Sequence, residues 1–112
     1  MTTDVDLRGW LGRVRHDLCK RLLWPARDRR DLGGALRPGE LVVALTDDEG
    51  RATTAGGLWQ ALRGAAPAGA DAAALDDFGA AVAQAARAAE RDDLAGVLAL
   101  EAAFEALARN VK

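Results

Sequence analysis

The last forty residues carry two apolar stripes at helical spacing, and no other feature constrains the fold as strongly. The first stripe contains Leu75, Phe78, Val82, Ala86 and Ala89, and the second contains Val97, Leu100, Phe104, Leu107 and Val111. Steps of three and four residues place each set on one helix face. Asp71, and Asp92 or Asp93, stand where helix N-caps are needed. We therefore predict an antiparallel helical hairpin over residues 72–90 and 93–111, with one continuous bent helix as the alternative.

Residues 5–24 are predicted to form an amphipathic helix near the N-terminus. Its apolar face consists of Leu7, Leu11, Val14, Leu18 and Leu22, spaced by four, three, four and four residues. Pro25 disfavours regular helix at the residue before it, so we expect a kink or a break at Trp24. Residues 25–33 are predicted to form at most a short exposed helix, ended by Gly33 and Gly34.

Residues 40–55 differ in their residue pattern from the helical segments before them and favour a small β-hairpin. It joins a short apolar run, LVVAL, to the turn sequence DDEG, in which glycine supplies a left-handed conformation. We expect residues 41–46 to pair with residues 51–54. The alternative is a helix that begins at Pro38 and ends at Gly50.

A short helix and a linker are predicted between this hairpin and the C-terminal helices. Thr53 or Thr54 can cap the helix, whose apolar residues are Leu58, Trp59 and Leu62. Residues 64–71 then contain two glycines and a proline, which is typical of a linker. We expect one small domain, 1–112. Its parts are a basic helical segment (1–37), the hairpin with the short helix (40–63) and the helical hairpin (71–112).

Composition limits this chain to a single modest core. Of its 56 hydrophobic residues, 26 are alanine, which leaves 30 larger apolar side chains. A mainly α fold follows, and no apolar run reaches the roughly 18 residues that a membrane-spanning helix needs. The acidic N-terminus is unlike a secretory signal. The lone Cys19 cannot form an internal disulfide, so we expect a reducing, cytoplasmic location.

The basic N-terminal helix is the candidate docking surface. Residues 8–30 contain eight arginines and lysines against two aspartates, although the whole chain has a net charge of −2. Trp10, Asp17 and Trp24 follow one another at seven-residue steps, which places them on one flank of a regular helix. Tryptophan and arginine dominate binding hot spots, so the predicted partner-binding residues are Trp10, Asp17, Arg21, Trp24, Arg27 and Arg30. The alternative is that both tryptophans belong to the core of this chain.

Nucleic-acid binding is the alternative function of the same basic segment. Its candidate phosphate-binding residues are Arg13, Arg15, Lys20, Arg21, Arg27, Arg29 and Arg30. The sequence pI of about 5.3 and the acidic second half of the chain count against it.

His16 and Cys19 form the third candidate, a metal-dependent or thiol-dependent site one helical turn long. Structural zinc takes four ligands and catalytic zinc three protein ligands, whereas this sequence has one histidine and one cysteine. No phosphate loop, dinucleotide fingerprint or nucleophile motif accompanies them. We therefore predict no cofactor, no metal and no catalytic residues.

These patterns together predict a small cytoplasmic, non-catalytic protein-binding module. Its most concrete form is an accessory subunit or assembly factor of a larger complex, which docks through the Arg/Trp-rich N-terminal helix. The apolar stripes of the C-terminal helical hairpin also suit association with a second copy, which would complete a four-helix bundle.

Overall fold

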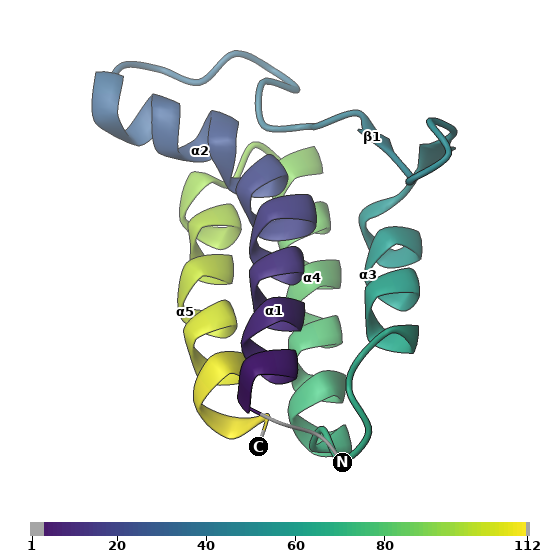
Figure 1. Ribbon diagram of the computed structural model, residues 1–112. Coiled ribbons are helices and arrows are strands. Elements are labelled where there is room, and N and C mark those ends of the chain that lie inside the picture. The colour runs from purple at the N-terminus through teal and green to yellow at the C-terminus, as the bar shows by residue number, and fades with distance from the viewer. Residues whose placement is uncertain (1–3, 112) are drawn as a thin grey trace.

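The computed structural model describes residues 4–111, and these residues form a mainly helical molecule with one small β-hairpin (Figure 1). Residues 1–3 and 112, the two ends of the domain expected from the sequence, lie outside the described residues. Most of the helices stand side by side as columns, and one helical segment leaves them at one end (Figure 1). The predicted mainly α fold is confirmed.

The N-terminal half begins with one helical path made of three segments. These segments, α1 (Asp4–Val14), the π-helical turn η1 (Arg15–Cys19) and α2 (Lys20–Leu32), follow one another without a loop. The predicted amphipathic helix is confirmed, since four members of its apolar face are buried and the fifth is half-buried: Leu7, Val14, Leu18 and Leu22, with Leu11.

Pro25 lies inside α2, so the helix does not break at Trp24. Proline removes one backbone hydrogen bond and favours a kink, and the ribbon bends between the column of α1 and the far part of α2 (Figure 1). The short exposed helix expected over 25–33 is the continuation of α2. The helix ends at Gly33, which has a φ of 73° and donates its N–H to the carbonyl of Arg29 at 2.8 Å.

The predicted hairpin is confirmed, and its helical alternative is wrong. Strands β1 (Leu45–Thr46) and β2 (Ala52–Thr53) pair antiparallel, with Leu45 opposite Thr53. The turn between them uses Gly50, whose φ is 80°. Both strands are shorter than the predicted ranges 41–46 and 51–54.

The first predicted strand is shortened by a turn at Gly39. This glycine has a φ of 75°, and its carbonyl accepts the N–H of Val42 at 3.2 Å. The turn directs Leu41 into the core, where it is buried together with Leu45. The hydrophobic run therefore covers one end of the helices, and most of it lies outside the strand.

Three side-chain caps begin the remaining helices, and each lies at a position suggested by the sequence. Thr54 caps α3 (Ala55–Gly64), Asp71 caps α4 (Ala72–Glu90) and Asp93 caps α5 (Leu94–Asn110). Each side-chain oxygen accepts the backbone N–H three residues on, at 3.0 Å.

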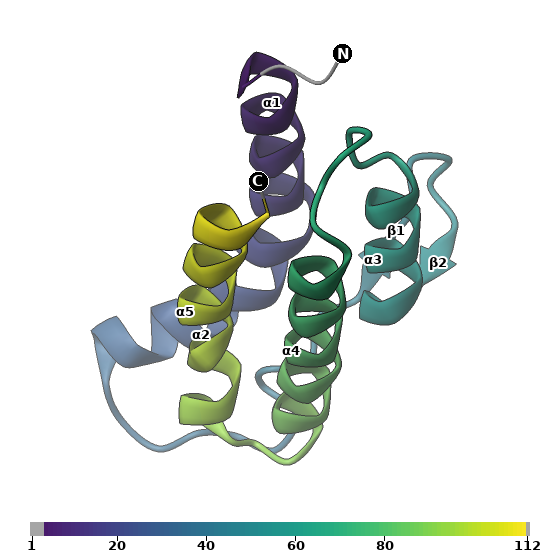
Figure 2. The same cartoon turned by 90° about the horizontal axis from the view of Figure 1, so that it is seen from below.

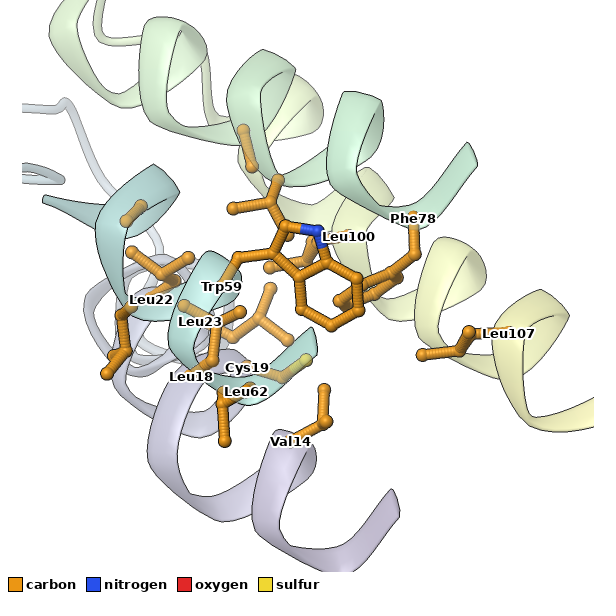
Figure 3. Close-up of a cluster of buried hydrophobic side chains, with 14 of the residues drawn as sticks. Val14, Leu18, Cys19, Leu22, Leu23, Trp59, Leu62, Phe78, Leu100 and Leu107 are labelled. Carbon is orange, nitrogen blue, oxygen red and sulfur yellow. The ribbon is translucent and has the colours of Figure 1, made fainter. Parts of the chain in front are cut away.

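The columns α1, α3, α4 and α5 pack around one apolar core, with α4 and α5 as the antiparallel pair predicted from their stripes (Figures 1 and 2). Trp59 from α3 lies inside this core, surrounded by side chains from the other helices (Figure 3). Its ring meets the edge of Phe78 at a centroid distance of 4.9 Å and lies 6.1 Å from the ring of Trp10.

Close packing of α3 against α4 depends on Gly79. A Cβ at this position would lie 2.7 Å from Nε1 of Trp59, which is closer than side-chain atoms pack. The indole N–H of Trp59 is buried and finds no acceptor among the described residues. A buried unpaired donor costs about 1–3 kcal/mol, which the surrounding apolar burial must offset.

Candidate functional site

The two tryptophans of the N-terminal helical path lie in opposite environments. Trp10 is 4% exposed, and its indole N–H donates to the carbonyl of Leu62 in α3 at 2.7 Å. A side chain buried in this way cannot contact a partner, so Trp10 is not a docking residue and belongs to the core. Trp24 is 63% exposed and remains available for binding.

The π-helical turn η1 explains why the two rings separate. The N–H of Lys20 donates to the carbonyl of Arg15, five residues earlier in the chain. In an α-helix it would donate to the carbonyl four residues earlier. Such a turn contains about one extra residue, which rotates the following side chains by about 100° relative to a regular helix. The seven-residue spacing that predicted a common flank for Trp10 and Trp24 therefore does not hold across η1.

Exposed large apolar side chains concentrate in α2 and the segment that follows it. Among the described residues these are Trp24, Leu32 and Val42, which are 63%, 77% and 55% exposed. Trp24 and Leu32 are eight residues apart on α2, close to the spacing of two helical turns. The end of α2 that carries Leu32 reaches past α5, away from the columns (Figures 1 and 2).

The arginines predicted for docking differ in the hydrogen bonds and ion pairs that they already form within this chain. Arg27 donates to Oε1 of Glu101 in α5 at 2.9 Å, and Arg30 reaches the same oxygen at 3.5 Å. Arg21 donates once, to the carbonyl of Thr46 at 3.2 Å. Arg21 therefore keeps most of its five donors free for another molecule.

Asp17 does not join this face, because it pairs with Arg13 of the preceding turn at 3.9 Å. The side chain of Asp17 is about one-third exposed. Arg13 also lies 3.7 Å from Asp48 in the hairpin turn. Asp17 thus faces Arg13 and the hairpin side of the helix, where Arg13 also meets Asp48.

An ion pair that was not foreseen holds the segment after α2. Arg29 donates to both carboxylate oxygens of Glu40, at 2.6 and 2.8 Å, and to the carbonyl of Gly33 at 3.0 Å. The hydrogen bonds from Arg29 lower the pKa of the Glu40 carboxyl below its usual range. The N–H of Gly39 donates to Asp92 in the α4–α5 turn at 2.8 Å, so this segment is fixed at both sides.

His16 and Cys19 lie on the same turn but differ in exposure. His16 is exposed, whereas Cys19 is buried among core side chains (Figure 3). Burial raises the pKa of the Cys19 thiol to about 12. The thiol therefore stays protonated near neutral pH and is a poor nucleophile and a poor metal ligand. Residues 4–111 contain no group of three or more side chains suited to hold a metal ion.

A groove of about 320 Å³ runs between the N-terminal helical path and α5. One wall consists of Arg15, His16, Cys19, Lys20, Leu23 and Arg27, and the other consists of Glu101, Phe104 and Glu105. The sequence did not indicate this groove, because its two walls are more than seventy residues apart in the chain. One of its walls does contain residues that the sequence indicated for other sites, namely His16, Cys19, Arg15, Lys20 and Arg27.

Comparison of this chain with protein-family models, with curated proteins and with solved structures gave no match. Within the described part of the chain, no helix combines the length and the apolar character needed to cross a membrane.

Proposed function

We propose that this protein is a small, non-catalytic binding module that docks onto a larger protein partner through the outer face of α2. The observation that carries this proposal is the exposure of Trp24, at 63%, on a helix that leaves the bundle. A soluble chain with only 30 large apolar side chains gains stability by burying them. Exposed apolar groups gathered on one projecting element are typical of an interaction site.

The partner that fits this face offers an apolar pocket for the indole ring and acceptor groups for Arg21. Trp24 and Arg21 are three residues apart and share one side of α2. Loss of a central tryptophan from an interface typically costs about 2 kcal/mol or more. Arg27 and Arg30 are already paired with Glu101, so we expect them to contribute at the rim.

Nucleic-acid binding has less support than it had from the sequence. Of its seven candidate residues, Arg13, Arg27, Arg29 and Arg30 pair with carboxylates of this chain. Each of those pairs would have to open before its arginine could neutralise a phosphate. We keep this function as an outcome of the test described below.

Self-association and location are the remaining parts of this proposal. The stripes of α4 and α5 that suggested a second copy are covered by α3, η1 and α2 of the same chain. A shallow alanine-lined groove on their outer side, with Ala73, Ala103 and Ala106, is the surface left for a copy, and light scattering would detect such a dimer. The lone reduced thiol of Cys19 favours the cytoplasm.

The test is quantitative capture of partners from lysate of the source cell, with wild type and Trp24→Ala compared side by side. A protein that is recovered with the wild type and depleted with the variant is then purified, and its Kd is measured. We expect Trp24→Ala to raise this Kd at least about tenfold, which corresponds to about 1.4 kcal/mol.

Arg109→Ala serves as the control, because Arg109 is exposed near the end of α5 and lies outside the proposed docking face. This variant should keep the wild-type Kd. Circular dichroism first checks that both variants fold. An unchanged Kd for Trp24→Ala contradicts the proposal. Recovery of nucleic acid instead, with affinity that falls steeply as salt rises and ignores Trp24, supports the alternative.

A further inference from the structure

We propose that the groove between η1 and α5 binds a small organic oxyanion with an apolar body, such as a carboxylate or a phosphate ester. Trp24 does not line this groove, which shares only Arg27 with the rim of the docking face, and the proposal does not depend on the function proposed above. Its volume of about 320 Å³ falls at the lower end of the range for small-molecule sites.

The π-helical turn brings two cations together at this groove. Five residues separate Arg15 from Lys20, which would place them about 140° apart around a regular α-helix. In η1 the N–H of Lys20 binds the carbonyl of Arg15, so the two residues lie one turn apart on the same side. Both line the groove, and neither pairs with a carboxylate among the described residues.

The charge around the groove favours an anion. Three cations, Arg15, Lys20 and Arg27, line it, and two carboxylates, Glu101 and Glu105, stand against them. Glu101 is already engaged by Arg27 and Arg30, at 2.9 and 3.5 Å, so the unpaired positive charge lies on the η1 side.

The floor of the groove is apolar, which favours a ligand with an apolar body. Cys19 and Leu23 are buried there, and the half-buried ring of Phe104 forms part of the opposite wall. The Cys19 thiol remains protonated and acts as a small apolar surface. A short hydrocarbon chain would therefore lie on this floor while its oxyanion contacts Arg15 and Lys20.

A distorted helical turn at the mouth of a groove supports the same assignment. π-helical turns are rare, are usually limited to one turn and are frequent at functional sites. Here the distortion coincides with the two cations and with the buried thiol, and it also turns Trp24 away from the flank of Trp10. The turn itself, Arg15–Cys19, contains neither proline nor glycine.

Octanoate and hexyl phosphate are the probes, and octan-1-ol is the neutral control of similar length. Titration followed by amide NMR should move signals of residues 15–27 and 101–105, with octanoate and hexyl phosphate binding more tightly than octanol. The two anions also show whether the site discriminates between carboxylate and phosphate. Their affinity should fall as salt is raised, because the contacts are ionic.

The double variant R15Q/K20Q tests the cations, and R8Q/R91Q removes two exposed charges elsewhere as the matched control. We expect R15Q/K20Q to weaken octanoate binding at least about tenfold and the control to bind within about twofold of wild type. Trp24→Ala should bind octanoate normally, which separates this site from the docking face. Equal binding of octanol and octanoate, shifts elsewhere in the protein or an unaffected double variant would overturn the proposal.

Discussion

The two ends of the N-terminal helical path, α1 and α2, both contain arginines and each carries a tryptophan, yet they are held in different ways. α1 buries Trp10 against α3, with a hydrogen bond to Leu62. α2 leaves Trp24 and Leu32 in solvent, and its far part, beyond the buried Ala26, is held by ion pairs. One element therefore contains a structural half and a half that is free to bind.

The kind of contact therefore differs along this helix, with buried apolar packing in α1 and ion pairs at the far end of α2. Truncating a fully buried tryptophan costs about 3–5 kcal/mol. The pair Arg27–Glu101 is partly exposed, and exposed pairs contribute about 0–1 kcal/mol. We therefore expect the end of α2 to open more readily than α1, as is common for binding elements.

Insertion of one alanine between His16 and Asp17 is expected to have the largest effect. The turn η1 already accommodates one extra residue, so a second one rotates the side chains of α2 by about 100° away from the core. We expect the free energy of unfolding to fall by more than about 3 kcal/mol, measured by urea denaturation. Insertion of one alanine after Ala35, an exposed residue outside the helices, is the control and should cost less than about 1 kcal/mol. Equal losses would show that η1 does not set the phase of this helix.

Substitution of the two tryptophans comes next. Trp10→Ala should lower the free energy of unfolding by about 3–5 kcal/mol, because it removes a buried ring and the hydrogen bond to Leu62. Trp24→Ala should change it by less than about 0.5 kcal/mol. Urea denaturation measures both. A loss from Trp24→Ala close to that from Trp10→Ala would mean that Trp24 also belongs to the core.

Two glycine substitutions of opposite sign test the packing of the bundle. Gly79→Ala places a methyl group against the buried ring of Trp59, and overpacking of this kind costs roughly 1–3 kcal/mol. Gly9→Ala meets no atom within 4 Å in the exposed part of α1 and should stabilise by up to about 1 kcal/mol. Thermal unfolding followed by circular dichroism compares them. A neutral Gly79→Ala would show that α3 moves freely on α4.

The smallest global effect is expected from Glu40→Gln, which removes the charge that holds Arg29. Amides of residues 33–44 should exchange faster with deuterium, while those of α1 stay unchanged. The pKa of Glu40 is lowered in the folded state, so its stabilising contribution is present above the ordinary carboxyl pKa of about 4.3 and is lost as pH falls through the lowered value. At low pH, the exchange rates of these amides in the wild type should thus approach those in the variant. Identical exchange in both proteins at pH 7 would contradict this.

The helices and their N-caps could be predicted from the sequence, because both depend mainly on residues that are close together in the chain. The stripes of α4 and α5 gave the antiparallel pair, and Asp71 and Thr54 begin the helices that they were expected to cap. The candidate site was harder to predict from the sequence. The environment of Trp24 depends on η1, and η1 depends on packing against other helices. The pair Arg27–Glu101 joins residues 74 apart, which no local pattern reveals.

The long reach of these contacts has a consequence for the nascent chain. η1 and α2 are made early, but α5, which packs against both of them, is made last. At about 5–20 residues per second, synthesis needs roughly 4 to 15 s to pass from Arg27 to its partner Glu101, 74 residues later. During this interval the apolar face of η1 and α2 that packs against α5 in the folded protein lacks this helix. This apolar face is therefore where we expect a chaperone to bind the growing polypeptide, and where early truncation would leave an aggregating fragment.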